Sequence, residues 1–437
     1  MLNNSPQLFE VCFKYISPEG LFRIAAPHSR PPLRIIKALV DHNSLETLKL
    51  LCQACPNLIK LQLIFAHSEV LIDGVILAAV QYCPLIEELP TQSMCLTDTA
   101  LNALATISTL KTLKLYPRRC TSAAIQRVLQ SNRANLLTIS IEGEFVDDAL
   151  VRCIGRCCGN LKSLKLVLYG TLAFSDSSLQ DLFRGCSQLE VLTLRQHAGG
   201  MSSATLQALF QYCQRLVELD LSINTVTSVN SEFVLHTPYP TLTKLRLTGK
   251  GVDDQTLRDI FTYCSNLKEV SLSGCIEVTD ETMSVLAHSC NSLCQLALCY
   301  CTSISVTITG MLEVATYCSS LTVLYLCSMP ISDKVLLQLS LNCRHLTSLQ
   351  AQLCTGGPVT EVGIVTLLQA CTGMTRLTIQ NHILTYVPAV LDPTMNVEKL
   401  GQLYPHIKYN LRQLRCQVHD GIYIYMYIIL YIHISIS

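Results

Sequence analysis

The sequence has no tryptophan, few charged residues and no excess of either charge. Of its 437 residues 15% are charged, and Lys plus Arg and Asp plus Glu each number 32. Proteins that bind nucleic acid usually carry a basic stripe that neutralises phosphates. The balanced composition therefore predicts no nucleic-acid partner.

Sequence motifs of common enzymes are also missing. The chain has no Gly-x-x-x-x-Gly-Lys-Ser/Thr, His-Glu-x-x-His or Gly-x-Ser-x-Gly motif. The segment Thr248–Gly251 lacks the glycine spacing of a phosphate-binding loop. The eleven histidines are scattered. We therefore expect a protein that is not an enzyme and that needs no cofactor.

Signals for export or membrane insertion are weak at both ends. The N-terminal sequence MLNNSPQLFEV lacks the basic and apolar regions of a signal peptide. The tail at 421–437, GIYIYMYIILYIHISIS, is apolar but short for a span and has no basic flank. A tail anchor and a terminal strand stay open, and translation of non-coding sequence is favoured. We expect a cytoplasmic or nuclear protein without a membrane partner.

A repeat of about 26 residues organises the chain between residues 45 and 419. Its core is Leu-x-x-Leu-x-Leu, a pattern that predicts a short strand with alternate residues buried. The first apolar residue recurs 24 to 28 residues apart at Leu58, Ile86, Leu110, Leu136, Leu161, Leu189, Leu216, Leu242, Leu267, Leu293, Leu321, Leu346 and Met374. One unit cannot bury its apolar face alone, whereas a stack of units buries a continuous core.

Cysteine precedes this anchor by three residues in ten of the thirteen repeats, with Ile107, Arg133 and Tyr239 as the exceptions. A zinc site needs four convergent ligands, usually from two short Cys-x-x-Cys or His pairs, and no such pairs occur here. The regular position instead predicts small buried core residues in a reducing compartment. We therefore expect no metal site.

The repeat resembles the cysteine-containing leucine-rich repeat of F-box/leucine-rich-repeat proteins. A second cysteine of that pattern stands at Cys275, Cys301 and Cys354. The resemblance implies an α/β solenoid shaped like a horseshoe, with parallel strands on the concave face and helices on the convex face. Aspartates at helix N-caps are expected at Asp98, Asp147 or Asp148, Asp176, Asp254, Asp280 and Asp333.

Residues between the apolar strand positions are expected to face the concave side. We predict that partners bind there, because solenoids present extended concave surfaces and because Tyr and Arg often anchor interfaces. A merely solvated sheet face remains the alternative for any single residue. The predicted partner-binding residues are Arg195, Asp220, Arg246, Glu269, Ser271, Tyr325, Gln350, Gln352, Arg376 and Gln380.

Residues 1–44 precede the counted repeats. The segment SPQLFEVCFKYISPEGLFRIA is predicted to form an amphipathic helix and a second short helix. It is similar to an F-box, although Gly20 replaces an acidic residue and PHSRPPLRI replaces the usual end. The alternative is a capping helix for the solenoid. The residues that the resemblance implies for adaptor binding are Leu8, Phe9, Phe13, Tyr15, Ile16, Pro18, Leu21 and Arg23.

These observations predict three parts: an N-terminal helical segment at 1–44, a solenoid of about 13 repeats at 45–419 with an irregular C-terminal cap around Leu411, and the tail from 420 to 437. The resemblance implies a substrate-recognition subunit of an SCF-type ubiquitin ligase, with the SCF adaptor and a degradation substrate as protein partners. The alternative is a non-catalytic scaffold or inhibitor without a ligase role.

Overall fold

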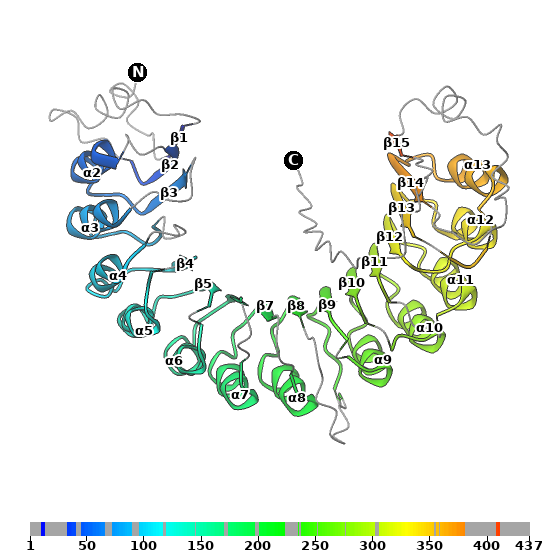
Figure 1. Ribbon diagram of the computed structural model, residues 1–437, viewed down its shortest axis with the longest axis horizontal. Helices are drawn as coiled ribbons and strands as arrows, with labels where there is room; N and C mark the ends of the chain where they lie inside the picture. The colour runs from blue at the N-terminus through cyan, green and yellow to red at the C-terminus, as the bar shows by residue number, and fades with distance from the viewer. Residues whose placement is uncertain are drawn as a thin grey trace, which may run out of the picture.

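The computed structural model forms an open arc in which strands line the inner side and helices the outer side (Figure 1). It describes residues 10–13, 33–40, 45–65, 72–89, 96–116, 119–144, 146–169, 174–196, 201–222, 235, 237–250, 252–275, 277–301, 306–353, 355–357, 359–380 and 408–410. The predicted leucine-rich-repeat solenoid is thereby confirmed.

Strands and helices alternate along most of the described chain. The strands are β1 (Glu10–Phe13), β2 (Ile35–Val40), β3 (Lys60–Phe65), β4 (Thr112–Leu115), β5 (Thr138–Gly143), β6 (Ser163–Leu168), β7 (Val191–Gln196), β8 (Glu218–Ser222), β9 (Lys244–Thr248), β10 (Glu269–Ser273), β11 (Gln295–Cys299), β12 (Val323–Cys327), β13 (Ser348–Gln352), β14 (Arg376–Gln380) and β15 (Lys408–Asn410). The helices are α2 (Leu45–Ala54), α3 (Asp73–Tyr82), α4 (Asp98–Leu104), α5 (Ser122–Ser131), α6 (Asp148–Cys157), α7 (Asp176–Gly185), α8 (Ser203–Tyr212), α9 (Asp254–Tyr263), α10 (Asp280–Ser289), α11 (Ile308–Tyr317), α12 (Asp333–Asn342) and α13 (Glu361–Ala370).

The strands pair in sequence order and all pairs are parallel. A three-stranded sheet holds β1 to β3, and a twelve-stranded sheet runs from β4 to β15. Glu88 joins the two by isolated bridges to Lys60 and Thr112. The repeat that contains Glu88 forms only these bridges and not a longer strand. Two residues after Glu88, Pro90 has no N–H to donate to a neighbouring strand.

The apolar positions of the motif form one continuous core between the strands and the helices. In β10, Val270 and Leu272 are buried while Glu269, Ser271 and Ser273 are partly exposed. This alternation is the period-2 burial that the sequence predicts. A single short repeat buries little apolar surface by itself. Stacking compensates for this, because each repeat covers the apolar face of the next.

The repeated cysteines are core residues that also tie adjacent repeats together. The Cys343 thiol donates to the backbone oxygen of Cys318 at 3.4 Å, and the Cys371 thiol donates to that of Cys343 at 3.4 Å. Equivalent contacts join Cys83 to Cys55 and Cys186 to Cys158, each at 3.5 Å. These carbonyls are at helix ends, where no further helical N–H is available. The prediction of core cysteines is confirmed.

Two of the expected exceptions to the cysteine position have structural substitutes. The buried phenol of Tyr239 donates to the backbone oxygen of Cys213 and accepts from the N–H of Leu216 at 3.3 Å. At the exception predicted for Arg133, the preceding residue Asn132 is the buried one. The side-chain oxygen of Asn132 accepts from the N–H of Leu110 at 3.0 Å. Each polar side chain therefore takes over a hydrogen bond between repeats.

The predicted N-cap role of the aspartates is wrong at five positions. Thr97, Ser175, Asp253, Thr279 and Ser332 are the N-caps, so the aspartate that follows each is the first helical residue. The expected cap is confirmed at Asp147, which accepts from the N–H of Leu150 at 2.8 Å. Ser202 caps α8.

These first-turn aspartates instead bind the N-cap residue of the next helix. In Figure 1 the helices stand side by side, which brings each helix start against its neighbour. The carboxylate oxygen accepts from the backbone N–H in seven pairs: Asp73–Thr97 at 3.1 Å, Asp98–Thr121 at 2.8 Å, Asp148–Ser175 at 2.9 Å, Asp176–Ser202 at 3.1 Å, Asp254–Thr279 at 2.9 Å, Asp280–Thr307 at 2.7 Å and Asp333–Thr360 at 2.8 Å. We call this set the aspartate ladder.

Hydrogen bonds set the charge state of one carboxylate in this ladder. Burial alone would raise the pKa of Asp148, but the hydrogen bonds from Ser175 and Ser178, together with the charge of Arg152, lower it. The ladder carboxylate is thus held in its charged form. It offers a charged acceptor to donors that lack a helical partner.

The N-terminal region differs from the prediction. The prediction of a helix around residues 8–16 is wrong at Glu10–Phe13, because these residues form β1. A further strand, β2, occupies Ile35–Val40. The register pairs Val11 with Ile36 and Ile36 with Leu61. The sequences Leu8-x-x-Val11-x-Phe13 and Leu33-x-x-Ile36-x-Ala38 both follow the strand motif, 25 residues apart. The predicted boundary at residue 45 is therefore wrong, and the sheet begins before it.

Two further regions are only partly described. Residues 223–234, between β8 and β9, lie outside the described residues. At the C-terminal end, Leu377 pairs with Tyr409 rather than with Leu414. The last described strand therefore precedes the predicted anchor at Leu411. The predicted tail at 420–437 lies outside the described residues.

Candidate functional site

The concave face is built from three parallel rows of side chains that cross the sheet. In each strand the first, third and fifth residues face away from the core, as Glu269, Ser271 and Ser273 do in β10. The register places the third residues of β4 to β14 in one row, in the order Lys114, Ser140, Lys165, Thr193, Asp220, Arg246, Ser271, Ala297, Tyr325, Gln350 and Thr378. This is the alignment that the sequence predicts.

The predicted charged residues meet in the centre of the arc. Asp220 lies between two arginines: its Oδ2 is 2.6 Å from Nη2 of Arg195 and 3.5 Å from Nη1 of Arg246. On β8 to β10, Nζ of Lys244 is 3.2 Å from Glu218 and 3.4 Å from Glu269. The charges of the predicted central residues are thus largely satisfied by one another.

Lys244 is the cation in that second cluster whose ionisation is perturbed. The hydrogen bond with Glu218, followed by the charges of Glu218 and Glu269, raises the pKa of Lys244 against a smaller opposing effect of burial. The lysine therefore stays charged at neutral pH. The side chains are 44% and 36% exposed for Lys244 and Glu269, so solvent screens this cluster and its contribution to stability is small.

The predicted C-terminal residues form a part of the face whose only charged member is Arg376. Tyr325 is on β12, and Gln350 and Gln352 are on β13. The Tyr325 hydroxyl lies 3.4 Å from Oε1 of Gln352. Arg376 is exposed at the start of β14, and Gln380 ends that strand, without a described side chain. Structure thus groups these residues, but whether they bind a partner stays a prediction.

Sequence reasoning missed three residues at the ends of the strands. Tyr300, Ser328 and Leu353 follow β11, β12 and β13 directly and have backbone φ angles of 53°, 59° and 53°. Non-glycine residues seldom adopt this left-handed conformation. Glycine occupies the equivalent positions 249 and 274, after β9 and β10. Comparing these five positions across the repeats would have marked the change, since glycine gives way to side chains there.

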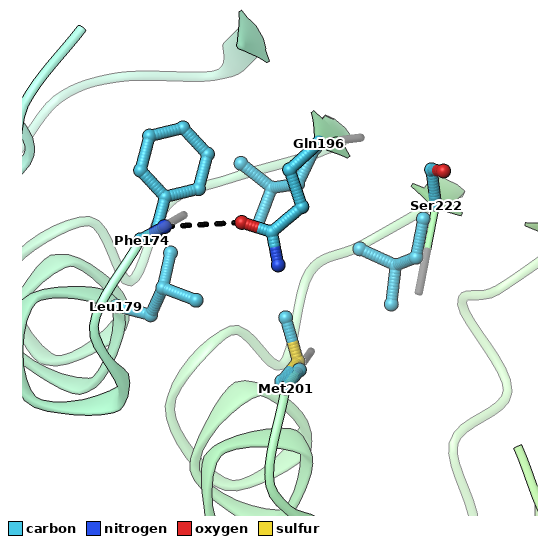
Figure 2. A pocket seen from close by; sticks show the side chains of 7 residues that line it. Phe174, Leu179, Gln196, Met201 and Ser222 are labelled. Atoms are coloured by element: carbon cyan, nitrogen blue, oxygen red, sulfur yellow. Dashed lines mark hydrogen bonds between the residues drawn. The ribbon is translucent and has the colours of Figure 1, made fainter. Parts of the chain in front are cut away.

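A small hollow lies beneath the face near β7 and β8 (Figure 2). Phe174, Leu179, Met201 and Ser222 are among its lining residues, and Oε1 of the buried Gln196 accepts from the N–H of Phe174 at 3.1 Å. Its volume is about 10 Å³, which is room for about one water molecule. This hollow therefore offers no space for an organic ligand.

The side chains that usually bind metals or carry out redox chemistry are dispersed in this fold. Within the described part of the chain there is no group of three or more His, Cys, Asp or Glu side chains arranged to hold a metal ion. Burial raises the thiol pKa of core cysteines, for example to about 12 at Cys264 and Cys290. These thiols therefore stay protonated at neutral pH and are poor nucleophiles. None of the helices in the described segments is long and apolar enough to span a membrane.

Of the predicted adaptor-binding residues, the structure describes the backbone of Phe13, in β1. The others, Leu8, Phe9, Tyr15, Ile16, Pro18, Leu21 and Arg23, lie outside the described residues. An F-box would present paired helices at this segment. The strand at Glu10–Phe13 extends the repeat sheet instead, and adaptor binding by this segment stays a prediction.

Comparisons with known proteins give distant likenesses. No protein-family model matches the chain. A Caenorhabditis elegans protein named "Putative RNA-binding protein EEED8.10" is 28% identical over 233 residues, which are 52% of this chain and 30% of that protein's length. Among solved structures, a chain in the crystal structure of the Rad7 and Elc1 complex in yeast has a TM-score of 0.41 and 18% identity, over 68% of this chain and 83% of the other.

The chain thus matches less than a third of the length of its curated relative. That relative is named for RNA binding, so the comparisons give no support to the predicted absence of a nucleic-acid partner. The relative is much longer than the matched segment, so the activity of that whole protein is not assigned to this chain.

Proposed function

We propose that this chain is a non-catalytic recognition protein that holds a partner protein on its concave face. The observation that carries this proposal is the unbroken register of β4 to β14, which aligns rows of mostly polar side chains facing away from the core over eleven adjacent strands. A surface of this length suits an extended macromolecular partner better than a small molecule. The absence of an organic-sized hollow at Gln196 agrees with this choice.

A protein partner is preferred to RNA because of the charge on the face. The central arginines share Asp220, and Lys244 is shared by two glutamates. Cations that are already paired would have to break those contacts to bind phosphates. Nucleic-acid binding depends on releasing counterions through unpaired Lys and Arg. RNA binding is therefore the competing outcome of the test.

A narrower form of the proposal is substrate recognition for an SCF-type ubiquitin ligase. The resemblance of the repeats to those of F-box/leucine-rich-repeat proteins supports it. Such a subunit would act by positioning, because tethering raises the local concentration of target lysines near the conjugating enzyme. The strand at Glu10–Phe13 weighs against adaptor docking through an F-box helix at that segment.

The test compares two arginines that differ in face but little in exposure. Arg246 on the concave sheet is 50% exposed, and Arg184 on the convex helix α7 is 53% exposed. The full chain, Arg246→Glu combined with Tyr325→Ala, and Arg184→Glu are each used to capture partners from cells after crosslinking. Bound proteins and bound RNA are quantified separately.

We expect proteins that are lost with the concave variant and retained with the Arg184 variant. Capture that is equal for all three chains would refute concave binding. If the concave variant loses bound RNA, and the full chain keeps that RNA when proteins are digested, the partner is RNA and not a protein. For the narrower proposal, purified SCF adaptor is mixed with the full chain and with Phe13→Ala and Leu21→Ala. If the intact chain does not retain it, the ligase role is rejected.

A further inference from the structure

At the C-terminal part of the concave face, residues other than glycine adopt a left-handed backbone conformation that glycine would adopt more easily. After each strand from β9 to β13 the chain turns through one residue with positive φ, at Gly249, Gly274, Tyr300, Ser328 and Leu353. At the first four of these positions the turn has a structural purpose, because the N–H of the residue donates to the last carbonyl of the next strand. The distances are 2.8 Å for Gly249 to Ser273, 2.8 Å for Gly274 to Cys299, 2.9 Å for Tyr300 to Cys327 and 2.9 Å for Ser328 to Gln352.

Glycine can make this turn without steric cost, and it does so twice. Tyrosine, serine and leucine make the same turn in the next three repeats with a conformational penalty. The backbone hydrogen bonds are the same with glycine, so they do not explain the side chains. Non-glycine residues held in such conformations are found preferentially at ligand-binding sites, where the side chain is needed.

These three residues border the uncharged part of the sheet. Tyr300 is 48% exposed, so about half of its side chain is open to a partner. Interaction with the Cys327 thiol, followed by burial, raises the pKa of Tyr300. We call Tyr300, Ser328 and Leu353, with Tyr325, Gln350 and Gln352 beside them, the C-terminal rim.

The concave positions of β11 to β13 contain no charged residue. They are Gln295, Ala297 and Cys299, then Val323, Tyr325 and Cys327, then Ser348, Gln350 and Gln352. Strands β7 to β10, in contrast, carry the paired charges around Asp220 and Lys244. A charged ligand buried on β11 to β13 would lose hydration without gaining a counter-charge. Amide and phenol groups suit the hydrogen-bonding groups of an uncharged polypeptide.

We propose that the C-terminal rim binds an uncharged segment of the partner protein that presents an aromatic or aliphatic side chain. Tyr300, Tyr325 and Leu353 supply apolar contact area to that side chain. Gln350 and Gln352 donate to and accept from the segment's backbone. The inference rests on the proposed function and adds the chemistry of the partner and the strands that contact it.

The experiment selects peptides from a random displayed library on the full, immobilised chain and measures the affinity of the enriched peptides. The main variants are Tyr300→Gly and Tyr325→Ala. Arg246→Ala reports on the central part of the same face, and Arg184→Ala, on the convex helix α7, is the control. Tyr300→Gly removes the phenol at a position where glycine fits the backbone. Far-UV circular dichroism and a melting curve for each variant then separate lost binding from lost folding.

We expect enriched peptides without net charge that contain an aromatic or aliphatic anchor. Truncating an aromatic anchor should weaken binding about tenfold or more, as is usual for such residues. Arg184→Ala should change the affinity by less than about twofold, as expected for a residue outside the contact. Binding that is equal for Tyr300→Gly, Tyr325→Ala and Arg246→Ala overturns both this inference and peptide recognition on the concave face.

A second outcome separates the two proposals. Charged peptides that lose affinity with Arg246→Ala and keep it with Tyr300→Gly would overturn the rim as the binding site, while recognition on the concave face would stand. If no peptide is enriched above the level seen on a blank surface, the rim is overturned as a peptide-binding site. Concave recognition would then be judged by the crosslinking test alone.

Discussion

Replacing Asp280 by alanine should loosen the contact between two neighbouring repeats. Asp280 is the first residue of α10, and its carboxylate accepts three hydrogen bonds from the start of α11. The N–H and hydroxyl of Thr307 donate at 2.7 and 2.6 Å, and the N–H of Gly310 donates at 3.0 Å. Alanine removes all three and leaves these donors to water.

The magnitude follows from the number and exposure of these bonds. A hydrogen bond to a charged group contributes about 1.5–3 kcal/mol net, and water can replace part of it where the donors are exposed. The Thr307 bonds are exposed, whereas the Gly310 bond is partly buried. We therefore expect Asp280→Ala to lower the free energy of unfolding by about 2–4 kcal/mol. Asp280→Asn, which keeps one acceptor oxygen, should lose about half of that.

The assay must detect a local change, because a solenoid is stabilised by contacts between nearest neighbours. Amide hydrogen exchange in α11 is compared with exchange in α6, far along the arc, alongside urea unfolding of the whole chain. Glu277→Ala, in the exposed loop before α10, is the matched control. We expect faster exchange in α11 alone and no change with the control.

One result would refute the reasoning about the aspartate ladder. If Asp280→Ala and Glu277→Ala unfold within about 0.5 kcal/mol of each other, the range of neutral surface substitutions, and α11 exchanges as before, the carboxylate does not hold the repeats together. If exchange instead rises along the whole chain, the effect is global and the nearest-neighbour description is wrong.

Three further predictions concern the same inter-repeat contacts. Tyr239→Phe removes a buried hydroxyl that bonds two backbone groups, so it should lower the unfolding free energy by about 1–3 kcal/mol, whereas Tyr317→Phe, at a 46% exposed tyrosine, should leave urea unfolding unchanged. Gly310→Ala places a methyl group against the Asp280 carboxylate, so calorimetry should show a lower Tm, and a smaller decrease when Asp280 is already alanine; equal decreases would exclude this clash. Burial raises many core thiol pKa values to about 12, as at Cys264 and Cys290, above the unfolded value of about 8.5. The free energy of unfolding is therefore at its full value below about pH 8.5 and falls as the pH rises toward 12, by about 1.4 kcal/mol per pH unit for each thiol. Circular dichroism should show unfolding between about pH 9.5 and 11, and a chain that is stable to about pH 12 would contradict this prediction.

The repeat was readable from sequence wherever its motif was intact. Leu267, Val270 and Leu272 recur at a fixed spacing in copy after copy, so the strands, the buried cysteines and the concave rows could be predicted together. The prediction failed where another pattern matched the same residues. Leu8, Val11 and Phe13 fit a strand, whereas the apolar residues of the same segment also fit an amphipathic helix. Periodicity alone does not separate the two in so short a segment.

The local sequence by itself determined the fold class, because burial at every second strand residue and a cysteine at most helix ends can be satisfied only by stacking units. It did not determine what Asp280 binds, since an N-cap and a contact to the next helix place the same residue at a helix start. Only the tertiary structure decided that, by bringing Thr307 of another repeat to its carboxylate. Tertiary structure also decided the backbone at Tyr300, because the left-handed turn arises from its bond to the next strand. Both depend on residues about one repeat away, beyond the reach of local propensity.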